Sequence, residues 1–216
     1  MKSELKKRIL STFILLTVVL VVITQGLIIL NLFLLACFFI ALFEWHRMSN
    51  NRKYFYPGII FLILSFFTVF KLSNTNNYYL YFLIILLICI STDLGGYIFG
   101  RLLKGPKLTR ISPKKTFSGL FGGIFLSLLS VSYFLKIDYL IIETEISFKL
   151  LILVTSISIV SQIGDIIISY FKRLSKIKDT GSIIPGHGGI LDRIDGMLFA
   201  FPFSYVILLI NFSKIL

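Results

Sequence analysis

Long apolar segments separated by short basic loops constrain the fold of this chain more than any other feature of its sequence. Residues 9–43 form one apolar run, too long for a single membrane span of about 20 residues. Gln25 and Gly26 interrupt it and predict a tight turn between two helices. Five further spans are predicted at residues 57–70, 78–100, 117–135, 150–171 and 196–212. The sequence therefore predicts an all-α, polytopic integral membrane protein with about seven transmembrane helices.

The composition excludes an ordinary soluble domain. Of the 216 residues, 56% are hydrophobic and only 15% are charged, where a soluble domain has about 25% charged residues. No polar interval is long enough for a separate soluble domain, so residues 1–216 are expected to form one membrane domain. Within it, residues 1–77 supply N-terminal hydrophobic helices and residues 78–216 carry the polar motifs. Cys37 and Cys89 lie inside predicted spans, where packing is the expected role.

The positive charge predicts an orientation in the membrane rather than a nucleic-acid partner. The formal net charge is +12, and the basic residues flank apolar spans, as orientation signals do. Of the 22 Lys and Arg residues, 18 fall on one side of the seven-span arrangement and four on the other. The positive-inside rule then places the N-terminus and the motif loops in the cytoplasm, in a multi-pass protein of the cell membrane.

A polar stripe marks the predicted helix at 150–171. At 3.6 residues per turn its members lie close to one line: Ser158, Gln162, Asp165, Ser169 and Lys172. An acidic residue inside an apolar span costs about 2.5–3.5 kcal/mol, so Asp165 requires either a bound cation or an internal salt bridge. The cation is the favoured alternative, because Asp192 and Asp195 follow closely and gathered carboxylates repel unless a metal or bases lie between them.

Two earlier segments also carry polar groups suited to phosphate or metal. Asp93 is an intramembrane carboxylate in the predicted helix 78–100, and such a residue is a functional candidate by default. The segment 111–119 places Ser112, Lys114 and Lys115 just before Thr116, a candidate N-cap for the next helix. Lysines beside a helix N-terminus attract phosphate, although the same charges also satisfy the positive-inside rule.

The glycine-rich loop 185–189 allows backbone N–H groups to turn toward an anion. Basic residues surround it in sequence, and together they could neutralise a triphosphate and a lipid phosphate. Asp165, Asp192 and Asp195 are the candidate metal ligands, because Mg²⁺ prefers carboxylate oxygens. A second cation is left open.

Three segments together, 91–101, 111–119 and 169–195, resemble the CTP:phosphatidate cytidylyltransferase family, over roughly the C-terminal 60% of the chain. The resemblance implies transfer of a cytidylyl group from CTP to phosphatidic acid, with Mg²⁺, giving CDP-diacylglycerol and pyrophosphate. It implies catalytic roles for Asp165, Asp192, Asp195, Lys172 and Arg193. It also implies substrate contacts for Asp93, Ser112, Lys114, Lys115, Thr116, Ser169, Arg173, Lys178, Asp179, His187, Gly188 and Gly189.

The chain departs from the family pattern in two places, and some alternatives remain. Ser118 stands where the family commonly has Glu or Gln, and the N-terminal half is shorter than usual. A cytidylyltransferase or kinase acting on an ether lipid or polyprenol would keep much of the chemistry. A cation or proton transporter could use Asp93 and Asp165 as a relay, but would not need the long basic, glycine-rich segment. A homodimer is left open.

Overall fold

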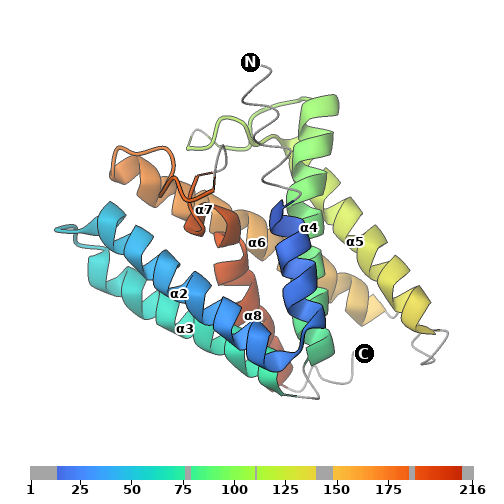
Figure 1. The fold of residues 1–216 in the computed structure, drawn as a ribbon. Helices are drawn as coiled ribbons and strands as arrows, with labels where there is room; N and C mark the ends of the chain where they lie inside the picture. The colour runs from blue at the N-terminus through green and yellow to red at the C-terminus, as the bar shows by residue number, and fades with distance from the viewer. Residues whose placement is uncertain (1–13, 76–78, 110, 140–147, 185–187, 211–216) are drawn as a thin grey trace.

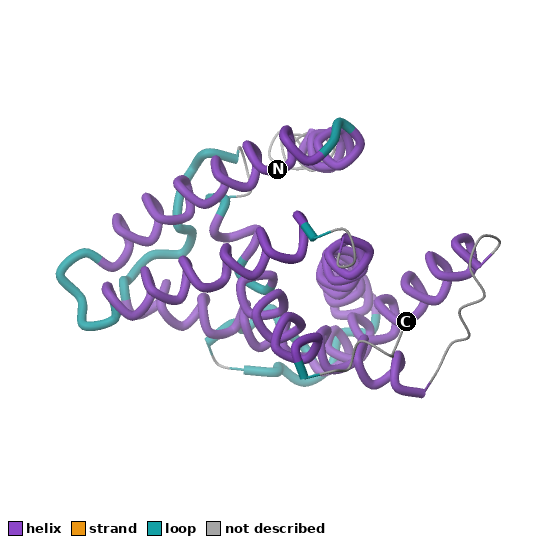
Figure 2. Tube along the Cα trace, turned by 90° about the horizontal axis from the view of Figure 1, so that it is seen from below, coloured by secondary structure: helices purple, strands orange, loops and turns teal. Residues whose placement is uncertain are grey.

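The computed structural model describes residues 14–75, 79–109, 111–139, 148–184 and 188–210. Helices account for most of this part of the chain, and no strand occurs in it (Figures 1 and 2). The first is a helix at Ile14–Thr24, and the others are α2 (Leu27–Ser49), α3 (Phe55–Asn74), α4 (Tyr79–Leu102), α5 (Phe117–Tyr139), α6 (Phe148–Leu174), α7 (Leu191–Ile194) and α8 (Met197–Leu209).

The predicted helical membrane architecture is confirmed. Five helices, α2 to α6, are long and apolar enough to cross a membrane, whereas Ile14–Thr24 and α8 are apolar but shorter. The predicted break at Gln25 and Gly26 is also found, and Gly26 has a φ of 97°, a left-handed conformation that glycine adopts without strain. A helix thus occurs at each of the seven predicted places, while seven membrane crossings remain a prediction.

Small residues bring α4 and α5 together. Gly95 and Gly96 on α4 face Gly122 and Gly119 on α5 so closely that an added Cβ would meet backbone atoms of the opposite helix. Gly123 of α5 similarly approaches the backbone of Thr92. Close approach through small residues is the usual packing of membrane helices. The small residues on α4 therefore allow a close helix contact, with α5 as the partner.

Helices α3, α4 and α6 pack around α8. One apolar cluster lies beneath the polar end of the molecule and combines side chains of five helices: Trp45, Leu62, Ile168, Leu191 and Leu198. Its members fix the positions of α2, α3, α6, α7 and α8 relative to one another. The short helix α7 therefore packs on an apolar base through Leu191.

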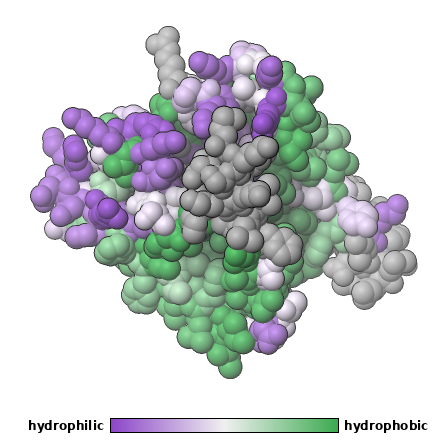
Figure 3. Space-filling model, turned by 45° about the horizontal axis from the view of Figure 1, so that its top comes forward, coloured by the Kyte–Doolittle hydropathy of each residue, from purple (hydrophilic) through white to green (hydrophobic). Residues whose placement is uncertain are grey.

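The surface divides into apolar and polar regions. Many large apolar side chains are exposed on the long helices, as expected for helices that face lipid. Hydrophilic residues gather in the upper part of the face shown in Figure 3, and hydrophobic residues cover the lower part. The loops that precede α5 and α7 lie toward this end of the molecule in Figure 1.

Candidate active site

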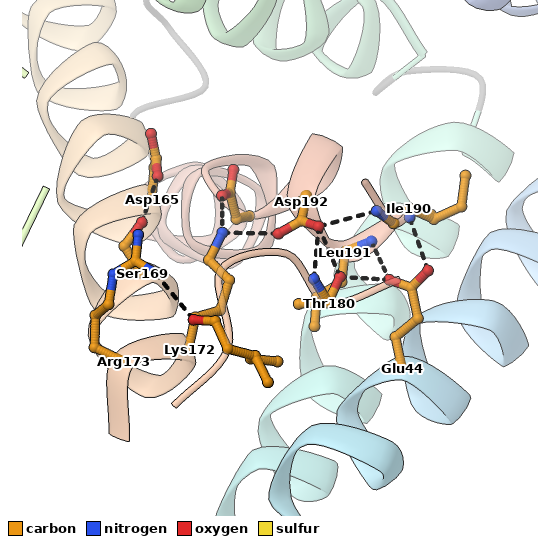
Figure 4. A network of polar contacts seen from close by, with 12 residues as sticks. Glu44, Asp165, Ser169, Lys172, Arg173, Thr180, Ile190, Leu191 and Asp192 are labelled. Carbon is orange, nitrogen blue, oxygen red and sulfur yellow. Dashed lines mark hydrogen bonds and ion pairs between the residues drawn. The ribbon is translucent and has the colours of Figure 1, made fainter. Parts of the chain in front are cut away.

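The polar stripe of α6 faces the interior of the molecule, as its spacing predicted. Ser158 and Lys172 are buried, and the Ser158 hydroxyl lies 2.8 Å from that of Thr92 on α4. Further along the stripe, the Ser169 hydroxyl donates to Asp165 Oδ1 at 3.2 Å. The stripe therefore lines one side of a polar centre toward the C-terminal end of α6 (Figure 4).

Lys172 joins two of the predicted metal ligands. Its Nζ lies 2.7 Å from Asp192 Oδ1 and 3.9 Å from Asp195 Oδ2. Asp192 belongs to the short helix α7, and Asp195 follows it directly, so the spacing of three residues places both carboxylates toward α6. The carboxylates of Asp192 and Asp195 are therefore accompanied by a basic group, the Lys172 ammonium.

Asp165 forms an ion pair with Lys115, whose Nζ lies 2.6 Å from Asp165 Oδ2. The Lys115 ammonium also donates to the carbonyl oxygen of Gln162 at 3.2 Å. Of the two alternatives for Asp165, the internal salt bridge is thus the contact that the structure contains. The predicted phosphate-binding lysine is held beside the predicted metal ligand, and both side chains are partly exposed, at 21% and 28%.

The predicted N-cap at Thr116 is confirmed. Thr116 precedes α5, and its hydroxyl oxygen accepts a hydrogen bond from the Gly119 N–H at 3.1 Å. This bond satisfies one of the unpaired N–H groups of the first helical turn. The turn before this helix is closed by the Ser112 carbonyl oxygen, which accepts a hydrogen bond from the Lys115 N–H at 3.0 Å. The loop and the helix cap thereby place Lys115 against α6.

The glycine-rich loop is closed by a hydrogen bond from the Ile184 N–H to the Gly188 carbonyl at 2.9 Å. Gly188 has a φ of 86°, and a Cβ there would meet Asp192 Oδ2 at 2.6 Å, so only glycine fits. The Gly189 N–H donates to Asp192 Oδ2 at 2.9 Å. The expected N–H groups thus do turn toward an anion, but in the described residues that anion is a carboxylate of the protein. His187 lies outside the described residues.

The sequence analysis missed Glu44 as a member of this centre. Glu44 lies on α2 and is 2% exposed, and its carboxylate accepts hydrogen bonds from the Ile190 and Leu191 N–H groups and from the Thr180 hydroxyl. Figure 4 shows it opposite Asp192 across the loop. No local signal identified it, because an acidic residue beside Trp45 at a helix end resembles a membrane-interface cluster.

The remaining predicted basic residues lie at the surface. Lys114 and Lys178 are exposed, as is Asp179, and the exposed Arg173 donates to the Ile177 carbonyl at 3.0 Å. Arg193, on α7, is also exposed, and it lines an apolar cavity. The structure therefore brings Lys115 and Lys172 into the centre and leaves Lys114, Arg173 and Lys178 around its rim.

The apolar cavity has a volume of about 380 Å³ and opens beside the polar centre. Its walls come from the helix Ile14–Thr24 and from α2, α3, α4 and α8, together with the residues around α7. Asp93 and Arg193 are its charged members, and the other residues that line it are apolar. Asp93 is thus placed where the apolar cavity meets the charged groups.

The two aspartates around α7 differ in their protonation behaviour. Burial raises the pKa of Asp195 well above its ordinary value, and the carboxylates of Asp165 and Asp93 raise it further, against the effect of Lys172. Burial would also raise the pKa of Asp192, but hydrogen bonds from Lys172, Gly189 and Thr180 lower it below its ordinary value. Asp192 is thus held as an anion, whereas Asp195 lies among carboxylates that repel its charge.

Comparison with known proteins gives a consistent match. The model of the family described as "Cytidylyltransferase family" matches residues 6–80 and 59–211. The phosphatidate cytidylyltransferase of Rickettsia bellii is 37% identical over 95% of this chain and 91% of its own length. That of Staphylococcus epidermidis is 44% identical over 60% of this chain and 49% of its own, and that of Bacillus subtilis 38% identical over 69% and 55%. The chain spans about half the length of the latter two relatives.

Proposed function

The chain belongs to the cytidylyltransferase family, and from this premise we propose that it is a phosphatidate cytidylyltransferase, a nucleotidyltransferase of phospholipid biosynthesis. Its substrates would be CTP and phosphatidic acid, and its products CDP-diacylglycerol and pyrophosphate. The observation that carries the proposal is the meeting of Lys115, Asp165, Lys172 and Asp192 at one centre, beside an apolar cavity. Bases and carboxylates suit a nucleotide triphosphate, and the cavity suits the acyl chains of a lipid.

The reaction requires little acid or base chemistry from the protein. A phosphate oxygen of phosphatidic acid forms a bond to the α-phosphorus of CTP, and the bond from that phosphorus to the bridging oxygen of the β-phosphate breaks. The electron pair leaves with pyrophosphate. Because the nucleophile is already an anion, the tasks of the chain are to bring two anionic substrates together and to offset their charge. Lys115 and Lys172 are placed for the second task.

Mg²⁺ is the proposed cofactor, and Asp165, Asp192 and Asp195 are its proposed ligands. Carboxylate oxygens are the donors that Mg²⁺ prefers. Burial raises the pKa of Asp195 and the carboxylates of Asp165 and Asp93 raise it further, and this repulsion favours a cation among them. Within the described ranges, no group of three or more acidic, His or Cys side chains is spaced so that it could hold a metal ion. When bound, Mg²⁺ would neutralise charge on the phosphates; the residues that hold it would contribute orientation and negative charge.

The three aspartates do not fit this role equally. The oxygens of Asp192 already accept from Lys172, Gly189 and Thr180, which occupies most of its acceptor capacity. Asp165 Oδ1 accepts the Ser169 hydroxyl and its Oδ2 pairs with Lys115, whereas Asp195 Oδ1 accepts the Gly196 N–H. Asp165 and Asp195 therefore fit the cation best, and Asp192 best fits the positioning of Lys172.

The motif loops are proposed to face the cytoplasm, where CTP is found. This orientation rests on the 18-to-4 division of basic residues across the predicted spans. It places the polar centre at the cytoplasmic end of α6 and leaves the apolar cavity within the membrane, from which a lipid substrate would come.

Purified protein in detergent, incubated with radiolabelled CTP, phosphatidic acid and Mg²⁺, tests the proposal. Labelled CDP-diacylglycerol, separated by thin-layer chromatography, is expected only when all three components are present. Parallel reactions with an ether-lipid phosphate, a polyprenyl phosphate and diacylglycerol distinguish the alternatives. Product from one of these lipids, with none from phosphatidic acid, would replace the proposed substrate. Release of pyrophosphate from CTP without phosphatidic acid would contradict the reaction.

A further inference from the structure

Glu44 is a buried carboxylate to which the proposed reaction assigns no role. Its Oε1 accepts from the Ile190 N–H at 3.0 Å, and its Oε2 accepts from the Leu191 N–H at 2.8 Å and from the Thr180 hydroxyl at 2.8 Å. All three donors belong to the segment that leads into α7. A side chain of α2 is thus bonded to Thr180 and to the start of α7, the helix that carries Asp192.

Thr180 connects Glu44 to Asp192. Its hydroxyl lies 2.8 Å from Glu44 Oε2 and 3.0 Å from Asp192 Oδ2, and its N–H donates to the same Asp192 oxygen at 2.8 Å. Asp192 in turn accepts from Lys172. The two carboxylates therefore hold the loop from opposite sides, and a displacement of the loop on the Glu44 side would be transmitted to Asp192 and Lys172 (Figure 4).

The glycines at the two ends of the loop make the approach of Glu44 possible. A Cβ on Gly181 would meet Glu44 Oε1 at 2.6 Å, and a Cβ on Gly189 would meet both oxygens of the same carboxylate. Neither glycine has a positive φ, so the close approach of Glu44, and not the backbone conformation, excludes a side chain there. These two glycines thus leave room for the carboxylate.

Burial of Glu44 is expensive unless its charge is compensated. Among the described residues, no Lys, Arg or His forms an ion pair with it, so its three hydrogen bonds supply the compensation that the structure shows. An apolar residue at this position would avoid the cost of burying a charge, but it would leave the Ile190 and Leu191 N–H groups without this acceptor. The carboxylate adds a fixed geometry, because its oxygens accept specific backbone and hydroxyl donors.

We propose that Glu44 is a positioning residue, which holds Thr180, Ile190 and Leu191 where they present Asp192 and Lys172 to the substrates. It does not touch the substrates itself. The inference rests on the proposed cytidylyl transfer, because the groups that Glu44 positions are those assigned to that reaction.

Glu44→Gln tests the inference, with Thr68→Val as a matched control. Gln has nearly the same shape, but its amide NH₂ would face a donor N–H of Ile190 or Leu191. Thr68 is buried on α3, and its hydroxyl donates to the Ser65 carbonyl, away from the loop. We expect kcat per folded molecule to fall at least about tenfold in Glu44→Gln, since a misplacement of about 1 Å costs about a hundredfold. Thr68→Val should keep kcat within about twofold. If Glu44 is merely structural, Glu44→Gln would lower the folded fraction but not kcat per folded molecule.

A mutant cycle with Gly181→Ala tests whether the loop acts through Glu44. In the otherwise wild-type protein, the new Cβ should displace the carboxylate and lower kcat about tenfold. In a Glu44→Ala background the clash with the carboxylate is gone and the Gly189 Cα, at 3.3 Å from the new Cβ, is the close contact that remains. The same change should then lower kcat by less than about twofold. An equal effect of Gly181→Ala in both backgrounds would overturn the inference.

Amide hydrogen exchange at residues 190 and 191 provides a readout without substrate. Glu44→Gln should increase exchange at these two amides by at least about tenfold while α6 stays protected. Unchanged exchange would overturn the inference even if no product is formed by the wild-type protein. Absence of CDP-diacylglycerol from the wild-type reaction would instead refute the proposed function, and the exchange result would still decide how Glu44 acts on the loop.

Discussion

Replacement of Lys172 by Met should destabilise the protein far more than the same replacement of Lys115. Lys172 Nζ lies between Asp192 and Asp195, and the three side chains are 9%, 4% and 10% exposed. Methionine keeps much of the length and apolar character of the lysine stem while removing its charge. The change would leave two buried carboxylates without the base that accompanies them.

The expected cost follows from this burial. Removal of one partner from a buried ion pair costs about 3–5 kcal/mol, because the remaining charge is uncompensated. In a chain of this size each kcal/mol lowers the Tm by about 2–4 °C, so Lys172→Met should lower it by about 6–20 °C. The Lys115–Asp165 pair is 21% and 28% exposed, and solvent can replace much of the lost interaction. Lys115→Met should therefore cost about 1 kcal/mol, or about 2–4 °C.

Thermal denaturation of the purified variants in one detergent, followed by tryptophan fluorescence, measures both shifts. Trp45 belongs to the apolar cluster under the loop and reports on this end of the molecule. Equal Tm shifts for Lys172→Met and Lys115→Met would refute the reasoning, because the argument depends on the difference in burial. A Tm of Lys172→Met above that of the wild type would show that the buried lysine destabilises the protein and does not compensate the charge of the two aspartates.

Three further predictions concern the metal, the nucleotide and the orientation. Asp165→Asn should reduce turnover at least about tenfold and raise the Mg²⁺ concentration needed for half-maximal rate, with the protein still folded; normal Mg²⁺ dependence would contradict the metal assignment. Lys115→Ala should raise the KM for CTP or lower kcat/KM about tenfold or more, as expected for a charge-assisted hydrogen bond of about 1.5–3 kcal/mol, and unchanged kinetics would leave Lys115 as an orientation signal. Cysteines at Ser112 and Ser182 should react from the cytoplasmic side and one at Thr144, outside the described residues, from the opposite side; labelling of Ser112 and Thr144 from one side would refute the seven-span orientation.

The helices were predictable because membrane spans leave a strong local signal. Apolar length located all of the long helices, and the break at Gly26 followed from the polar pair that interrupts one run. The ends were less certain: α3 begins at Phe55, two residues before the predicted start at Pro57. Proline is tolerated in the first helical turn because its missing N–H would be unpaired there in any case. The four-residue helix α7 is too short for periodicity to indicate.

The site was predictable where its members share one helix or one motif. The spacing along α6 placed Asp165, Ser169 and Lys172 on one face, and each makes a polar contact there. Sequence alone could not assign the partners, because Lys115 and Asp165 come from different helices or loops 50 positions apart. Glu44 was missed for the same reason: its donors are 136 to 147 positions away.

The distance between Glu44 and its donors also bears on how the protein is made. Ribosomes add about 5–20 residues per second, so the carboxylate on α2 is synthesised roughly 7–30 s before Ile190 and Leu191 exist. During that interval α2 has entered the membrane with an acidic group whose permanent donors have not yet been translated. Water at the membrane surface must solvate that group until the last quarter of the chain arrives. Maturation of the site is therefore a late event of biosynthesis, completed when the newest segment docks against one of the oldest.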